Sequence, residues 1–164
     1  MTDSFPLLLA DAMLGRLCKW LRIVGYDTVY ALSWPDHQIA AQARAQNRIV
    51  LTRDRELAKR KGIRCLLIRS QKLEEQIETV LDAFGMPPTD RVRCPQCNTL
   101  LVSVSPQQAR GHVPRYILDT QHDFSYCPMC VKFYWPGSHW DHVQSILQRV
   151  RRARQSYEAK LGKS

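Results

Sequence analysis

Residues 7–25 read LLLADAMLGRLCKWLRIVG, and this stretch holds both elements of one β-α unit. Its first four residues form an apolar run of the length expected for a buried strand. Apolar residues then recur at helical spacing, at Leu14, Leu17, Leu21 and Val24. They would line one side of a helix, and Gly25 follows where helices commonly end on a residue of positive φ. We therefore predict a strand over residues 7–10 and a helix that Gly25 ends.

The same alternation continues to residue 84. Short runs rich in β-branched residues or leucine predict further strands over residues 28–31, 49–52 and 63–68. A helical pattern follows each run: one opened by Pro35 and Asp36, a short one from near Asp54 to Gly62, and one from Leu73 to Phe84. Because strands that alternate with helices form a parallel sheet, we predict an α/β fold with a parallel sheet flanked by helices.

A pair of prolines separates this region from the rest of the chain. The segment Met86-Pro87-Pro88-Thr89 cannot continue a helix, because proline lacks the amide hydrogen and restricts the residue before it. We predict an α/β domain over residues 1–86 and a second domain over residues 91–164. The second domain should contain a strand over residues 100–104, a helix with apolar residues between 143 and 150, and a basic tail.

Four of the six cysteines fall in two Cys-x-x-Cys pairs, Cys94 with Cys97 and Cys127 with Cys130. The two-residue gap lets both sulfur atoms of a pair face one ion, and two pairs supply the four soft ligands of a tetrahedral zinc site. The 29 residues between the pairs exceed the usual spacing of roughly 15 to 20, so a longer insert is required. We predict a small zinc-ribbon domain with one structural Zn²⁺.

Two alternatives remain for these thiols. A redox Cys-x-x-Cys is expected at the start of a helix beside a βαβ pattern, and neither pair lies in that context. Iron can occupy the same cage of thiolates. The other two cysteines, Cys18 and Cys65, lie within apolar runs and are predicted to belong to the core.

Three aspartates, Asp11, Asp36 and Asp54, stand just after a predicted strand or at the start of the helix that follows it. In a parallel sheet these points share the carboxyl edge, where open α/β folds bind ligands. Carboxylates gathered there need a counter-cation, and their hard oxygen atoms suit Mg²⁺ or Mn²⁺. Because such an ion can bind a phosphodiester and activate water, the aspartates predict metal-dependent phosphodiester hydrolysis.

Each of these aspartates can also be explained as a helix cap without a metal. Their shared edge and the nearby basic residues Arg16, Lys19 and Arg53 favour the catalytic interpretation. Arg22 continues the three-residue spacing of Arg16 and Lys19, so this side of the first helix should be solvated or contact phosphate.

The formal net charge of +9 is distributed unevenly along the chain. Residues 1–90 contain 13 basic and 11 acidic side chains, whereas residues 91–164 contain 11 and 4. The excess in the second half predicts a polyanionic partner. No stretch reaches the roughly 18 apolar residues of a membrane helix, and the N-terminus lacks the pattern of a signal peptide. We expect a cytoplasmic protein without membrane contact, and the oligomeric state is not predicted.

Several ordered segments resemble the Mut-seven C-terminal RNase domain family, a branch of the PIN-like nucleases with an appended zinc ribbon. The segments are residues 8–17 (LLADAMLGRL), Trp20-Leu21-Arg22, Gly25-Tyr26-Asp27, residues 51–57 (LTRDREL), both cysteine pairs and residues 136–140 (PGSHW). Together they cover roughly residues 7 to 145, and their combination is far more specific than any one of them.

The resemblance implies a PIN-like nuclease core that binds divalent metal through acidic residues and cleaves RNA. By motif, Asp11 and Asp54 correspond to metal ligands, and Asp36 to the acidic position at the start of the second helix; no fourth carboxylate is identified. Two other functions remain open. One is a non-catalytic zinc-ribbon adaptor that binds nucleic acid, and the other is a receiver-like domain with Asp54 as phosphoacceptor. Convergence of the three carboxylates would distinguish the nuclease from the adaptor.

Overall fold

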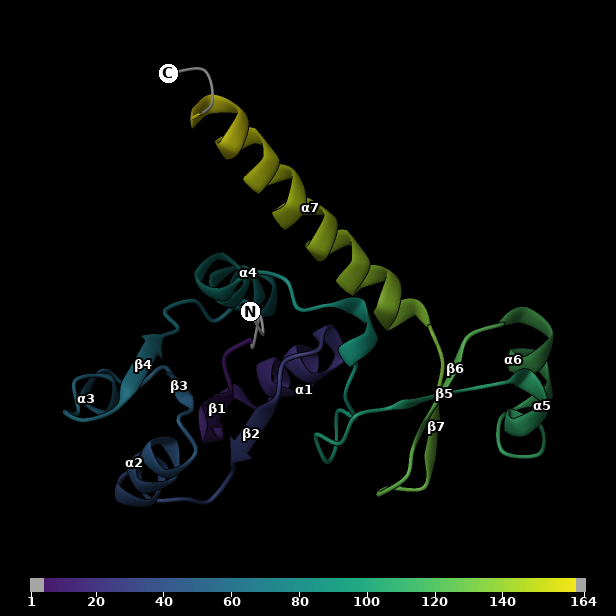
Figure 1. Ribbon diagram of the computed structural model, residues 1–164, viewed down its shortest axis with the longest axis horizontal. Helices are drawn as coiled ribbons and strands as arrows, with labels where there is room; N and C mark the ends of the chain where they lie inside the picture. The colour runs from purple at the N-terminus through teal and green to yellow at the C-terminus, as the bar shows by residue number, and fades with distance from the viewer. Residues whose placement is uncertain (1–4, 162–164) are drawn as a thin grey trace. The chain divides into compact units, whose positions relative to one another are not determined.

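The structure is a computed structural model in which residues 5–161 are described (Figure 1). The chain divides into two compact units, Met1–Leu101 and Val102–Ser164. They are called the N-terminal unit and the C-terminal unit below. No helix among the described residues is long and apolar enough to cross a membrane.

The N-terminal unit is built on a four-stranded parallel sheet in the order β2-β1-β3-β4. The strands are β1 (Leu8–Asp11), β2 (Thr28–Ala31), β3 (Ile49–Thr52) and β4 (Arg64–Leu67). Every residue of β1 and β3 is buried, as expected for the central strands of a sheet covered on both faces. The predicted α/β fold with a parallel sheet is confirmed.

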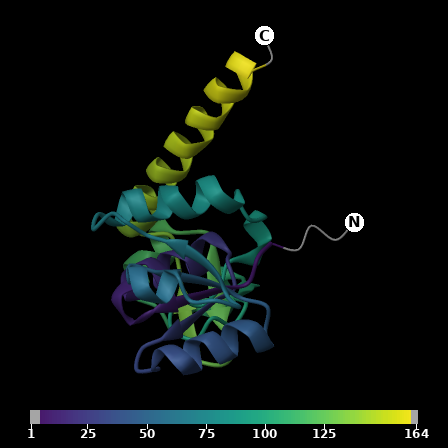
Figure 2. The same ribbon diagram turned by 90° about the vertical axis from the view of Figure 1, so that its left-hand side faces the viewer.

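Helices cover both faces of this sheet. They are η1 (Ala12–Leu14), α1 (Gly15–Val24), α2 (Asp36–Ala45), α3 (Arg55–Ala58) and α4 (Leu73–Phe84). Helix α2 packs Ile39 and Ala43 against Leu9 and Val50 of the sheet. Helices α1 and α4 contact each other, and Figure 2 shows α2 and α4 on opposite sides of the sheet. From β1 the chain goes to β2 on one side and then returns to β3 on the other side of β1. The strand order therefore reverses between β1 and β3, which is the point where open α/β sheets bind ligands.

Most predicted elements are present, and the differences have local causes. Strand β1 is shifted by one residue, so that Asp11 is its last residue rather than the first after it. Helix α1 ends at Gly25, whose φ of 119° is left-handed, as expected. The helix predicted from near Asp54 to Gly62 ends at Ala58. Its apolar pattern stops after Leu57, the one buried residue of α3.

The segment after α4 stays attached to the N-terminal unit up to residue 101. After η2 (Thr89–Arg91), the amide of Arg93 donates to the carbonyl oxygen of Arg22 at 2.9 Å. The side-chain amide oxygen of Asn98 accepts a hydrogen bond from the Thr28 amide at 3.0 Å. The first cysteine pair therefore lies in a segment bonded to α1 and β2. The domain bounds 1–86 and 91–164 stay a prediction.

The C-terminal unit contains a three-stranded antiparallel sheet in the order β5-β6-β7. Its elements are β5 (Val102–Val104), α5 (Pro106–Ala109), α6 (Arg115–Thr120), β6 (Phe124–Cys127), β7 (Lys132–Tyr134) and α7 (Ser138–Leu161). The insert between the cysteine pairs forms α5 and α6, and Ala109, Val113 and Phe124 form a small core there. Helix α7 buries one apolar stripe, at Val143, Ile146, Leu147 and Val150.

Candidate active site and metal centre

Asp11 is the last residue of β1 and is only 6% exposed. Its Oδ1 accepts a hydrogen bond from the Met13 amide at 3.0 Å, so the side chain caps η1. Its Oδ2 accepts a hydrogen bond from the hydroxyl of Thr52, the fully buried last residue of β3. The ends of the two central strands are thus joined by side chains at the carboxyl edge.

The same threonine also contacts the backbone of Asp54. Thr52 Oγ1 accepts a hydrogen bond from the Asp54 amide at 2.9 Å, while its hydroxyl hydrogen goes to Asp11. The Oδ1 atom of Asp54 accepts from the amides of Glu56 at 2.7 Å and Leu57 at 3.4 Å, and so caps α3. Within the described part of the chain, its Oδ2 has no hydrogen-bond partner and is available for another ligand.

Asp36 occupies a different position at this edge. It is the first residue of α2 and follows Pro35, the N-cap, whose side chain makes no capping bond. Its carboxylate is exposed and forms no hydrogen bond or ion pair in the described structure. Asp11 therefore ends β1, whereas Asp36 and Asp54 follow β2 and β3, the strands on either side of β1. The structure does not bring them into one cluster of three ligands: among residues 5–161, only the cysteines form such a group.

The predicted phosphate-binding residues lie in the segments that follow β1 and β3. Arg16 and Lys19 are exposed on α1, and Arg53 is half-buried between Thr52 and Asp54. None of the three forms a salt bridge with an aspartate of this edge in the described structure. Their charges and those of the aspartates are therefore not neutralised by pairing with each other.

The expectation of a solvated or phosphate-binding side chain is wrong for Arg22. This residue is only 7% exposed, and its Nε donates to the Thr28 carbonyl oxygen at 2.8 Å. Its Nη1 donates to the carbonyl oxygen of Pro95, also at 2.8 Å. Arg22 therefore holds the turn of the first cysteine pair. Its partner at Pro95 lies 73 residues away in sequence, so helical spacing gave no signal for this role.

Asp27 precedes Thr28, whose carbonyl oxygen accepts from Arg22, and its local sequence did not indicate a role. Its Oδ1 accepts from Arg48 Nη1 at 2.8 Å and Asn98 Nδ2 at 2.9 Å, and Arg93 Nη2 lies 3.5 Å from its Oδ2. Burial alone would raise the pKa of Asp27, but the hydrogen bonds and positive charges of these partners outweigh it and lower the pKa. Asp27 therefore stays ionised and anchors the first cysteine turn.

The four paired cysteines form the candidate metal centre. The sulfur atoms of Cys94, Cys97, Cys127 and Cys130 all lie within 4.8 Å of one another. The two turns have the same shape: the residue after each pair has a left-handed φ, 68° at Asn98 and 54° at Val131. The amides of these residues donate to the carbonyl oxygens of Cys94 and Cys127 at 2.9 Å. Four thiol sulfurs so placed can hold a metal ion such as zinc.

The two remaining cysteines lie away from this centre. Burial raises the pKa of Cys18 to about 11, against the smaller opposing effect of Arg22 and Lys19. Burial also raises the pKa of Cys65. A thiol with a raised pKa is a weak nucleophile at neutral pH, which agrees with the core role expected for both.

Comparison with models of protein families finds a match. The family model described as Mut7-C RNAse domain matches residues 6–147 of the chain. None of the curated proteins and none of the solved structures compared with the chain matches it significantly. The matched region includes all three edge aspartates and all four paired cysteines.

Proposed function

Because the chain belongs to the Mut7-C RNAse domain family, we propose that it is a divalent-metal-dependent ribonuclease that hydrolyses RNA phosphodiester bonds. The family's name indicates a nuclease-like role. The observation that carries the finer proposal is the linkage of Asp11 and Asp54 through Thr52 at the ends of β1 and β3. Two carboxylates on either side of the strand-order reversal occupy the position where this class of sheet binds its ligand.

The donor atoms at this edge fit a small hard cation. Asp11, Asp54 and Asp36 would hold Mg²⁺ or Mn²⁺ through carboxylate oxygens, which are the ligands such ions prefer. A bound ion of this kind polarises the phosphoryl group and lowers the pKa of an attacking water. Thr52 keeps the Asp11 carboxylate oriented by donating to Oδ2, while α3 fixes Asp54 through its cap. Arg16, Lys19 and Arg53 would bind the phosphates of the RNA strand.

We further propose that the cysteine centre holds a structural Zn²⁺. The matched turns and the buried sulfurs of Cys94 and Cys127 support this assignment. Iron in the same site is the alternative, and metal analysis of the purified protein distinguishes the two. Thiols kept for metal binding suit a reducing compartment, which supports the cytoplasm as the proposed location.

One observation favours a second candidate function. Because the aspartates do not form a cluster of three ligands in the described structure, a non-catalytic adaptor that binds nucleic acid through the same fold is the alternative. Such an adaptor would bind RNA without cleaving it.

A cleavage assay distinguishes the ribonuclease from the non-catalytic adaptor. We expect a labelled single-stranded RNA to be cut when Mg²⁺ or Mn²⁺ is added to protein freed of loosely bound divalent ions by gel filtration. A strong chelator is avoided, because it would also remove metal from the cysteines. The control is Asp90→Asn, which removes an exposed carboxylate from η2 and should cleave like wild type. Binding without cleavage under every metal tried would contradict the ribonuclease proposal and favour the adaptor.

A further inference from the structure

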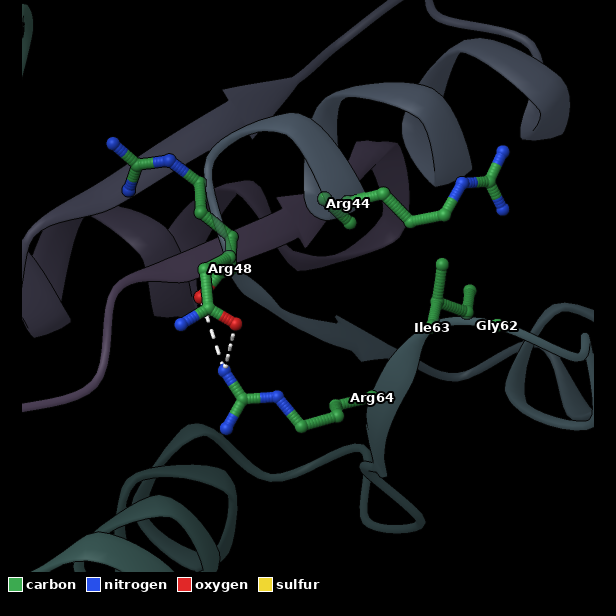
Figure 3. Close-up of a pocket in the computed structure, with 7 residues that line it drawn as sticks. Arg44, Arg48, Gly62, Ile63 and Arg64 are labelled. Atoms are coloured by element: carbon green, nitrogen blue, oxygen red, sulfur yellow. Dashed lines mark hydrogen bonds between the residues drawn. The ribbon is translucent and has the colours of Figure 1, made fainter.

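A hollow of about 420 Å³ lies at the edge of the sheet opposite the aspartates. It is lined by Ala43, Arg44, Asn47 and Arg48 from the end of α2 and the loop into β3, and by Gly62, Ile63 and Arg64 at the start of β4 (Figure 3). Strands β3 and β4 are parallel and both begin here. No carboxylate lines this hollow, so its polar groups are arginine and asparagine side chains and backbone.

Two of the three arginines carry positive charge that no acidic side chain of the described residues neutralises. Arg48 is paired with Asp27 at 2.8 Å. Arg64 is exposed, and its hydrogen bonds among the described residues go to neutral acceptors: its Nη2 donates to the backbone oxygen of Asn47 at 3.0 Å and to the side-chain oxygen at 2.9 Å. Arg44 is exposed, and its guanidinium group makes no hydrogen bond or ion pair in the described structure. The hollow therefore attracts anions.

The directions of Arg44 and Arg64 show which kind of anion fits. Figure 3 shows the guanidinium group of Arg44 above Gly62 and Ile63, whereas that of Arg64 extends away from them, where it donates to Asn47. A single phosphate is bound tightly when guanidinium groups converge on it. Two guanidinium groups on different sides of a hollow are instead suited to an extended chain, in which each group contacts a different phosphate. The geometry thus favours a polyanion over inorganic phosphate.

A series of basic residues connects this hollow with the aspartate edge. Residues 44–64 contain eight Lys or Arg and two Asp or Glu. The crossover from β3 to β4 runs from one edge of the sheet to the other and carries Arg53, Arg55, Lys59, Arg60 and Lys61. All but Arg53 are exposed. Glu56 is paired with Lys59 at 3.3 Å on the surface, where such a pair is weak.

We propose that the α2 end and the β3–β4 crossover bind single-stranded RNA, with Arg44 and Arg64 contacting phosphates distant from the aspartate edge. The proposal rests on the proposed function, since it takes RNA to be the ligand. A four-residue strand spans roughly 13 Å. A dinucleotide at the aspartates therefore cannot reach Arg44, whereas a longer strand can.

The test measures binding rather than cleavage, in protein that carries Asp11→Asn to prevent hydrolysis. We expect Arg44→Glu and Arg64→Glu each to weaken binding of a single-stranded RNA of about 12 nucleotides by roughly five- to tenfold, with a salt slope smaller by about 0.7 per lost contact. Arg91→Glu, an exposed charge reversal in η2, is the matched control. Arg44→Lys keeps the positive charge and should restore RNA binding. If the charge reversal Arg44→Glu unfolds the protein, Arg44→Gln takes its place in the comparison.

Two results would overturn this proposal. One is RNA affinity in both variants equal to that of Arg91→Glu. The other is displacement of the RNA by inorganic phosphate as effective as displacement by unlabelled RNA, which would indicate a small-anion site. A dinucleotide should bind equally well to all the variants. If Asp11→Asn proves to cleave like wild type, the proposed catalytic role fails, while the binding comparison among the arginine variants still decides the present inference.

Discussion

The cysteine centre and the aspartate edge differ in how far the protein itself assembles them. At the cysteine centre, four sulfur atoms lie within 4.8 Å of one another, and two turns of equal shape present them. At the aspartate edge, Asp11 and Asp54 are linked through one threonine, and Asp36 stands apart at the start of α2.

This contrast follows from the physics of the two ligand types. Bringing neutral thiol groups together before a metal binds costs little free energy. Carboxylates repel one another when crowded and ionised, so a protein stabilises them separately, as the caps of η1 and α3 do here. A compact cysteine group is therefore expected in the folded chain, whereas an acidic site can remain open until a cation enters.

The largest expected effect is that of removing one sulfur. Cys97→Ser should cost most of the metal affinity and unfold the C-terminal unit, because metal binding supplies much of the folding free energy of a small ribbon. Cys97 is exposed, so the serine disturbs no core. Metal content and thermal unfolding check this, with Met129→Ser, exposed between the other two cysteines, as control. Full metal content and an unchanged Tm in Cys97→Ser would show that the cysteines bind no structural metal.

A smaller effect is expected from Thr52→Val, which keeps the side-chain volume and removes the hydroxyl. The buried Oδ2 of Asp11 would lose its donor, which costs about 1–3 kcal/mol of unfolding free energy. Urea denaturation measures the change. If stability is unaffected, Thr52 does not hold the two aspartates in place.

Asp27→Asn should cost about 1–2 kcal/mol at neutral pH, because it weakens the charged hydrogen bond from Arg48 and removes the ion pair with Arg93. Since the folded-state pKa of Asp27 is lowered, its contribution is present above the unfolded pKa of about 4 and is lost as the pH falls through the folded value. The difference in unfolding free energy between wild type and Asp27→Asn should therefore disappear at acid pH. A stability difference that stays constant from neutral to acid pH would contradict this assignment.

The smallest effect on stability is expected for Asp36→Asn, below about 0.5 kcal/mol, because this exposed side chain makes no bond in the described structure. If Asp36 is a metal ligand, cleavage should nevertheless fall. Cleavage equal to that of wild type would remove Asp36 from the proposed site and leave the two linked aspartates.

Local sequence patterns predicted the strands and helix ends, which depend on interactions between residues close in the sequence. Apolar runs located the strands to within one or two residues, and glycines located the ends of α1 and α4, because these signals act over a few residues. Patterns could not predict the buried role of Arg22 or the contacts of Asp27, since their partners at Pro95 and Asn98 lie about seventy residues away. The Thr52 link was also missed, because a threonine that ends a strand is ordinary until its neighbour across the sheet is known.

The central claim is that Asp11 and Asp54 act together in RNA hydrolysis, and a double-mutant cycle tests it most directly. Cleavage of a single-stranded RNA is measured for wild type, Asp11→Asn, Asp54→Asn and the double variant, with thermal unfolding alongside. If both residues hold one ion, each single variant should lose nearly all activity, and the second substitution should remove little more. Single variants that fold and cleave like wild type would show that these aspartates are helix caps only.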